Sequence, residues 1–295
     1  MDKHFLKENR IHGDILFPLE TYGMSYWGPN SNLDCHWHDE MELLLVTEGR
    51  AVFQIETTFY EANAGHVLFI NSGELHAAYP ADDKPWSFQA VVFNPAFLKS
   101  ESYDSVRIKY LDPMDKKLLL PPRHMKYGSL WEKNLAASLK ELFSVYEAKP
   151  SCYEIKVKGL LFLMLSELLA NGTRGRPDDG TSRQTQKTER IKRILSHIHE
   201  HYGRKITLEE LASQVNMSEG HFCRFFKEMV NKSPVDYMNY FRVNKAAALL
   251  KEDERKIIEI AMEVGFDNTS YFISLFKHYM GTTPTGYRKG SRQEP

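Results

Sequence analysis

Short runs of apolar and alternating residues, separated by turn-forming residues, fill the region from residue 33 to residue 97. The runs occupy residues 43–46, 52–55, 67–70 and 87–93. Between them lie residues that favour turns, namely Gly49, Asn63, Gly65, Gly73 and Pro80. Strands of this length and spacing are typical of a β-sandwich or a β-barrel. We therefore expect an all-β domain here.

The hydrophobic period becomes helical after residue 127. Apolar side chains recur on one helical face, at Leu135, Leu139, Leu142, Phe143 and Tyr146. A second predicted helix, residues 153–169, is apolar over most of its surface. Such a helix must be buried within its domain or against a partner chain. The pattern leaves both alternatives open.

A polar segment follows the helical region. Residues 171–188 contain three glycines and a proline but no large apolar residue. This composition predicts a flexible linker and the clearest domain boundary of the chain. We therefore expect four parts: an N-terminal domain (1–126), a helical dimerisation or packing segment (127–170), the linker (171–188) and a C-terminal helical domain (189–295).

The C-terminal domain contains one helical pattern twice. In the first copy, Thr207 and Glu210 form a T-x-x-E capping box that opens a short helix, residues 208–215. Ser218 is a suitable N-cap for a second helix, which ends near Val230. The second helix carries a predicted buried stripe at i, i+3, i+4 and i+7, formed by Phe222, Phe225, Phe226 and Met229.

The second copy repeats this order further along the chain. It has a short helix (257–264), a turn at Gly265 and a second helix capped by Asp267 or Asn268. The stripe lies fifty residues after the first one and consists of Phe272, Leu275, Phe276 and Tyr279. Both copies close on a Pro-x-x-Tyr sequence. Two helices joined in this way form a helix-turn-helix unit, whose second helix enters the major groove of DNA.

A longer helix is predicted between the two copies. Ser233 and Pro234 supply a cap and a first-turn proline, and the pattern continues to about Lys251. A helix of roughly 19 residues is about 28 Å long. That length suits two second helices held near the ~34 Å repeat of B-DNA. One chain is therefore expected to reach two successive major grooves.

Charge and cysteine content fit this division. Residues 187–295 carry 18 Lys and Arg against 14 Asp and Glu, whereas residues 1–186 carry 20 against 25. A basic C-terminal part is a mild signal for nucleic-acid binding. Cys35, Cys152 and Cys223 are too dispersed for a disulfide framework or a paired-cysteine zinc site. No signal peptide or membrane-spanning run is evident, so we expect no membrane association and a cytoplasmic location.

About a hundred C-terminal residues resemble the AraC family of bacterial transcription regulators. The resemblance is carried by residues 206–212, 225–227, 233–237, 242–250, 260–266, 270–272, 276–277 and 283–288. It implies an independently folding DNA-binding domain with two helix-turn-helix units, and another domain that senses a ligand or mediates dimerisation. It also implies RNA polymerase as a partner, activation in most relatives, and a sugar or sugar derivative as effector.

DNA contact is expected on the exposed face of each second helix. Removing the buried stripes leaves Glu219, Gly220, Cys223, Arg224 and Lys227 on the first, and Asn268, Thr269, Ser270, Ile273, Ser274 and Lys277 on the second. Arg224 is the best reader of a base edge, because a guanidinium can bind guanine N7 and O6 together. The alternative is an ordinary surface arginine. Many family members have arginine where this chain has Ser274, so the second unit is expected to bind mainly the DNA backbone.

The N-terminal domain resembles the cupin fold, a small double-stranded β-barrel. The sequence His36-x-His38-x3-Glu42-x6-Gly49 matches the first cupin motif, and Gly65, Gly73 and His76 match the second. Asn71 and Pro80 depart from the residues usual in that second motif. In metal-binding cupins, the positions of His36, His38, Glu42 and His76 are the ligands. Three imidazoles and a carboxylate suit a first-row divalent metal ion. The alternatives are hydrogen bonds to a small polar effector, or histidines satisfied within the barrel.

The expected architecture is therefore multidomain. A cupin-like all-β barrel followed by helices precedes an all-α domain with two helix-turn-helix units. We expect a sequence-specific transcription regulator with double-stranded DNA and a small polar effector as partners, acting as a homodimer. The main alternative, a metal-dependent cupin enzyme with a helical appendage, has no need of two helix-turn-helix units. A DNA-alkylation repair protein would need a cysteine-rich zinc site. No catalytic residue is predicted.

Overall fold

The computed structural model describes residues 12–27, 32–102, 104–174, 181–252 and 254–290. The chain divides into two compact units, with the boundary between Thr185 and Gln186. No helix in the described ranges is long and apolar enough to cross a membrane.

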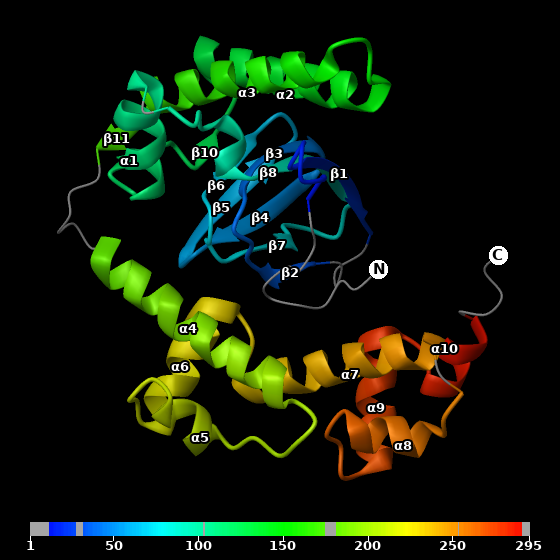
Figure 1. Cartoon of the computed structure of the whole chain (residues 1–295). Helices are drawn as coiled ribbons and strands as arrows, with labels where there is room; N and C mark the ends of the chain where they lie inside the picture. Colours follow the sequence, from blue (N-terminus) through cyan, green and yellow to red (C-terminus); the bar gives the residue numbers. More distant parts are fainter. Residues whose placement is uncertain (1–11, 28–31, 103, 175–180, 253, 291–295) are drawn as a thin grey trace. The chain divides into compact units, whose positions relative to one another are not determined.

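Two antiparallel sheets form the centre of the N-terminal unit (Figure 1). One has the strand order β1-β8-β3-β6-β10 and the other β2-β7-β4-β5. We call these two sheets the barrel. Their strands are β1 (Leu19–Tyr26), β2 (Leu33–His36), β3 (Met41–Glu48), β4 (Arg50–Ile55), β5 (Thr58–Asn63), β6 (Val67–Ile70), β7 (His76–Pro80), β8 (Trp86–Phe93) and β10 (His124–Met125). The predicted all-β domain is confirmed.

Strand β3 shows how the sequence builds two cores from one sheet. Successive strand side chains point to opposite faces. Leu44 and Val46 join the cluster that includes Phe53, Trp86 and other residues of both sheets. Leu43 and its alternate neighbours join a second cluster that extends into the helices. The continuous apolar run of β3 is therefore explained by burial on both faces.

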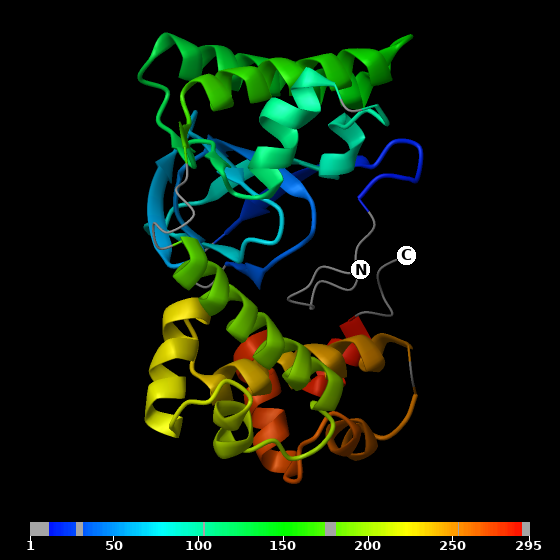
Figure 2. The same cartoon turned by 60° about the vertical axis from the view of Figure 1, so that its left-hand side comes forward.

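Helices α2 (Leu130–Ala148) and α3 (Tyr153–Ala170) lie side by side along one side of the barrel (Figure 2). A complete capping box between Ser129 and Glu132 begins α2. The inner face of α3 belongs to the core, since Leu161 and Leu168 are fully buried. Its outer face keeps Ile155 and Leu163 exposed, at 75% and 61%. Shorter helical segments precede the pair, namely η1 (Pro95–Leu98), η2 (Arg107–Leu111) and α1 (Asp112–Asp115).

The segment predicted as a linker, residues 171–188, contains regular structure at both ends. Strand β11 (Thr173–Arg174) pairs with β9 (Leu119–Leu120). Helix α4 (Thr181–His201) begins before the segment ends. The composition did not predict the beginning of α4 within this segment, because polar residues are compatible with a helix as well as with a loop. Residues 175–180 lie outside the described part of the chain.

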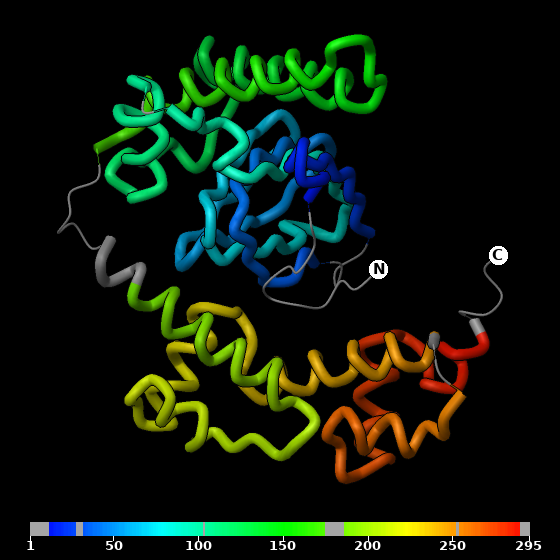
Figure 3. Tube along the Cα trace, in the orientation of Figure 1, coloured from blue at the N-terminus to red at the C-terminus, as the bar shows by residue number. Residues whose placement is uncertain are grey.

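The C-terminal unit is helical in its described part. Its helices are α4, α5 (Leu208–Ser213), α6 (Glu219–Val230), α7 (Pro234–Glu252), α8 (Ile257–Glu263), α9 (Thr269–Met280) and α10 (Pro284–Gly290). Figure 3 shows α7 running from the α5–α6 pair to the α8–α9 pair. Both predicted helix-turn-helix units are thus present, with helix ends within two residues of the predicted ones.

The two buried stripes differ in completeness. The paired phenylalanines Phe222 with Phe226 and Phe272 with Phe276 are all 0% exposed. Leu275 and Tyr279, expected in the second stripe, are only partly buried and pack at the edge of the core. The second stripe is therefore shallower than the sequence predicted.

Only some of the predicted helix-capping hydrogen bonds form. Asn268 accepts a hydrogen bond from the Tyr271 amide and caps α9. Ser218 occupies the N-cap position of α6, but its side chain makes no capping hydrogen bond. Thr207 accepts from the Glu210 amide, yet the capping box is incomplete. The Glu210 carboxylate instead accepts hydrogen bonds from Arg204, an alternative that spacing alone does not reveal.

The turn of the second helix-turn-helix unit, between α8 and α9, requires a glycine. Gly265 has φ +91°, and a Cβ atom there would lie 2.3 Å from the carbonyl oxygen of Tyr202. Arg242 donates to the same oxygen over 2.9 Å. This close approach connects the turn to Tyr202, just after α4, and to Arg242 of α7. It therefore fixes the position of the second helix-turn-helix unit relative to these two helices.

Candidate functional site

Helix α6 presents a polar face opposite its buried stripe. Glu219, Gly220, Arg224 and Lys227 are exposed, and Cys223 is half-buried beside them. In the described part of the chain, the side chains of Arg224 and Lys227 form no hydrogen bond or ion pair. Other arginines of the unit serve the fold: Arg242 binds backbone carbonyls. The cationic groups on α6 are therefore available to an external anion.

Helix α9 presents the corresponding polar face in the second helix-turn-helix unit. Of the six predicted contact residues, Asn268, Ser270, Ile273, Ser274 and Lys277 are exposed, and Thr269 is half-buried. The side-chain oxygen of Asn268 already accepts the hydrogen bond that caps its own helix. No basic residue stands at the position of Arg224, fifty residues on, where this chain has Ser274.

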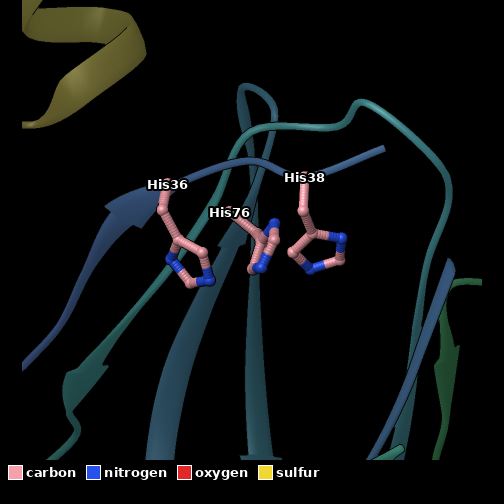
Figure 4. Close-up of side chains that lie close together, drawn as sticks. All are labelled: His36, His38 and His76. Atoms are coloured by element: carbon pink, nitrogen blue, oxygen red, sulfur yellow. The ribbon is translucent and has the colours of Figure 1, made fainter. Parts of the chain in front are cut away.

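The four residues of the predicted histidine site come together in the barrel. Strand pairing places His36 directly opposite His76. A hydrogen bond from the Gly73 amide to the His38 carbonyl ties the segment after β2 to the turn before β7. Figure 4 shows the three imidazole rings together, with His76 between the other two. Glu42, near the start of β3, lies on the barrel-facing side with Leu44 and completes the group.

Backbone carbonyls orient all three rings. The Nδ1 atoms of His36, His38 and His76 lie 2.7, 3.1 and 2.9 Å from the carbonyl oxygens of Asp34, Glu40 and Glu74. A carbonyl only accepts, so each Nδ1 carries the proton and donates it. Each ring consequently turns its Nε2 edge toward the centre of the group, where the Nε2 atoms of His38 and His76 lie 3.2 and 3.3 Å from Glu42 Oε2.

The electrostatics of the group are unusual for a buried site. Burial, together with the neighbouring His76 and His38, lowers the pKa of His36 well below its ordinary value. Burial alone would raise the pKa of Glu42, but the approach of His38 and His76 lowers it below the ordinary value of a glutamate. The group therefore combines a neutral imidazole with a buried carboxylate.

Comparison with known proteins assigns the two units. Residues 21–165 match the family model of the AraC-like ligand binding domain, and residues 211–290 match that of a helix-turn-helix domain. The HTH-type transcriptional regulator YdeC of Bacillus subtilis (strain 168) is 35% identical over 286 residues, which cover 96% of both proteins. The chain belongs to the AraC family. It is a transcription regulator with a ligand-binding domain followed by a DNA-binding domain.

More distant relatives of this AraC-family regulator also align along most of their length. The HTH-type transcriptional activator RhaS of Klebsiella pneumoniae (strain 342) is 23% identical over 267 residues, covering 89% of this chain and 90% of RhaS. The melibiose operon regulatory protein of Escherichia coli (strain K12) is 24% identical over 301 residues, covering 97% and 94%. The likeness thus spans both units.

The structure adds residues to the regulator's two surfaces that the sequence reasoning missed. His221 is exposed on the first turn of α6. Tyr271 is exposed on α9, and its hydroxyl accepts a hydrogen bond from Asn239 of α7. In the barrel, the His12 ring lies 5.5 Å from that of His38. His12 precedes the first strand, and no motif or periodicity marked it.

Aromatic side chains fill part of the barrel interior of the regulator. Trp86 stacks on Tyr26 with ring centroids 4.4 Å apart. Burial and the charges of Asp34 and Glu42 raise the pKa of Tyr26. The indole nitrogen of Trp86 is buried and has no hydrogen-bond partner among the described residues. A buried donor of this kind is costly unless another group accepts from it.

A separate cavity of about 370 Å³ lies on the outer side of the barrel. Thr21, Gly23 and Gln89 of the sheet line it together with Tyr146 of α2. It does not include the histidines or Trp86. Inside the barrel, by contrast, the Nε2 atom of His76 and the indole nitrogen of Trp86 are buried without a hydrogen-bond partner among the described residues.

Proposed function

We propose that this AraC-family regulator binds operator DNA with α6 as the helix that reads bases and α9 as the helix that anchors the DNA backbone. The observation that carries the proposal is the difference between two structurally matched exposed faces. Both have a lysine, Lys227 or Lys277, at the same position. Only α6 also has an arginine, and bidentate contact of arginine with guanine is the commonest specific contact in the major groove.

Affinity measurements on operator variants at several salt concentrations test this assignment. Arg224→Ala should cost about 1–3 kcal/mol of operator affinity and relax the preference at one base pair. Lys277→Ala should weaken binding to all sequences alike and lower the salt slope by roughly one. Arg224→Lys is the matched control, because it keeps the charge but loses the bidentate fork. Full discrimination at every base pair in Arg224→Ala would refute the placement of α6.

We further propose that the barrel binds a small polar effector, a sugar or a sugar derivative. The unpartnered Trp86 indole N–H would donate to an effector oxygen, and the stacked Trp86 and Tyr26 rings supply a flat apolar wall. One relative is named as a melibiose operon regulatory protein, which supports this class of effector. No step of the proposed function is catalytic.

The outer face of α3 is the proposed homodimer contact. Ile155 and Leu163 are exposed there, and Phe162 between them is partly buried. Exposed apolar side chains of this size on one helix fit contact with a second copy. We propose that the dimer acts as an activator that contacts RNA polymerase, since the relative RhaS is named as an activator. Binding to chromosomal DNA places the proposed activity in the cytoplasm.

A further inference from the structure

The first two turns of α7 contact both helices that carry the proposed DNA-facing surfaces. Tyr237 is 5% exposed, and its ring lies against that of Phe226 on α6 with centroids 5.6 Å apart. Asn239, two residues further on, donates a hydrogen bond from Nδ2 to the Tyr271 hydroxyl of α9 over 3.0 Å. Side chains two positions apart point to nearly opposite sides of a helix, since each residue turns it by about 100°. This part of α7 therefore connects α6 to α9.

An apolar core attaches α9 to the second half of α7. Val243, Ala246 and Leu250 of α7 belong to one buried cluster with Phe272 and Phe276 of α9. Burial of apolar surface stabilises this contact, but the hydrophobic effect has no directional preference. Packed helices of this kind cross at preferred angles with a scatter of roughly 15–20°. The core therefore holds the two helices together and leaves some freedom in the angle between them.

Polar and aromatic contacts add a second attachment on the first half of α7. Besides the bond between Asn239 and Tyr271, the Tyr279 hydroxyl donates to the Asp236 carbonyl over 3.5 Å. The Tyr279 ring also meets the Tyr240 ring edge-on, with centroids 5.3 Å apart. Tyr271 and Tyr279 are eight residues apart on α9, which is about 12 Å along the helix axis. Two contacts this far apart, outside the core, oppose rotation of α9 about its crossing with α7.

Asn239 makes the shorter of the two hydrogen bonds and is buried where its partner is not. It is 7% exposed, whereas Tyr271 is 49% exposed. A buried amide that loses its partner costs free energy, so the bond favours the position of Tyr271 in which the hydroxyl reaches Nδ2. The angular requirement of a hydrogen bond restricts this position further. A buried side chain of α7 consequently holds an exposed side chain of α9 in place.

We propose that Asn239 is a positioning residue: through Tyr271 it fixes α9 relative to α6, and it thereby sets the spacing between the two parts of the operator that the regulator accepts. The proposal rests on the proposed binding of both helices to DNA. One inserted base pair moves the second part by about 3.4 Å along the duplex and by roughly 35° around it. A rigid pair of helices cannot follow that movement, whereas a pair joined by the apolar core alone can follow part of it.

Affinities of the full-length protein for operators of altered spacing test this proposal. The reference operator is selected from random DNA by the wild type, and one base pair is then inserted or removed between its two protected parts. We expect the wild type to bind each altered operator about 10–100-fold more weakly. In Asn239→Ala and in Tyr271→Phe this penalty should be at least ~3-fold smaller, and the double variant should be no more tolerant than either single one. Tyr271→Phe keeps the ring at an exposed position and serves as the test should Asn239→Ala fail to fold.

The ratio of affinities between operators separates positioning from other roles. A contact of the Tyr271 hydroxyl with a DNA phosphate, or a general loss of stability, would weaken binding to every operator alike; an unchanged ratio in both variants overturns the proposal. Asn244→Ala is the matched control, because Asn244 is a buried asparagine of the same helix whose Nδ2 has no hydrogen-bond partner among the described residues. It should keep the wild-type penalty. A wild type that shows no spacing penalty would also overturn the proposal.

The base-reading role of α6 is measured separately, on base substitutions in the reference operator. If Arg224→Ala keeps full discrimination there while Asn239→Ala lowers the spacing penalty, the assignment of α6 is wrong and the positioning role stands. If Arg224→Ala loses discrimination while Asn239→Ala and Tyr271→Phe keep the wild-type penalty, only the positioning role is refuted.

Discussion

His199 makes the stability of the DNA-binding unit depend on pH. It lies on α4, and its ring stacks on Phe241 of α7 with centroids 4.2 Å apart and planes 8° apart. Its Nε2 atom lies 2.7 Å from the Tyr237 hydroxyl. Burial, and secondarily the charge of Lys245, lower the pKa of His199 from 6.5 to about 4. The neutral ring therefore holds α4 against the helix that joins the two helix-turn-helix units.

The size and sign of the effect follow from this lowered pKa. Below pH 6.5 the unfolded chain binds a proton at His199, whereas the folded chain does not do so until about pH 4. Unfolding is therefore increasingly favoured as the pH falls through this window. One pKa unit corresponds to about 1.36 kcal/mol, so the free energy of unfolding should fall by about 3 kcal/mol between pH 6.5 and pH 4. That is a large part of a typical domain stability of ~5–15 kcal/mol.

Urea unfolding of the fragment 187–295 between pH 4 and pH 8 measures this effect. The two-unit division and the separate helical core predict that this fragment folds alone. His199→Gln stays neutral at every pH and should remove about 3 kcal/mol of the pH dependence. Tyr237→Phe is the control: it removes the hydroxyl but keeps the ring, and the pH dependence should persist because burial lowers the pKa. An unchanged pH dependence in His199→Gln would refute the reasoning.

Three other changes probe the core, the turn and the outer helix. Phe276→Ala should lower the free energy of unfolding by ~3–5 kcal/mol in urea titrations, because a fully buried ring leaves a cavity. Gly265→Ala should cost more than Gly281→Ala, since both have positive φ but only Gly265 meets backbone atoms; the Gly281 change should cost roughly 1–2 kcal/mol, and equal losses would count against the steric argument. Leu163→Glu should produce folded monomers in sedimentation, whereas Leu161→Glu should unfold the N-terminal unit; a folded, dimeric Leu163→Glu would exclude the outer face of α3.

Much of the C-terminal unit was predictable because local signals agreed with each other. The stripes around Phe226 and Phe276, the cap at Asn268 and the prolines after each unit all indicated the same helices. Hydrogen-bond partners were less predictable. Glu210 has the spacing of a capping-box residue, but Arg204 competes for its carboxylate and is reached only through the tertiary fold. Local spacing shows which bond is available, not which one forms.

The sequence identified the side chains of the histidine group, but not the groups that surround them. The spacing of His36, His38 and Glu42 on neighbouring strand segments was visible as a motif. The carbonyls that orient the rings carry no side-chain signature, so no sequence pattern reveals them. His12 reaches the group from a distant segment and pairs with Tyr22 over 2.8 Å. Such contacts depend on how the chain folds back on itself.

The two helix-turn-helix units share their buried half and differ in their exposed half. Phe222 and Phe272 are both fully buried, and the lysines fifty residues apart are both exposed. A repeated core is required wherever the same scaffold must form twice, but nothing in the scaffold fixes the residue at an exposed helix position. Arg224 and Ser274 stand at such matched positions. The same fold can therefore carry a base-reading helix in one unit and a backbone-binding helix in the other, which is why the proposal assigns specificity to α6.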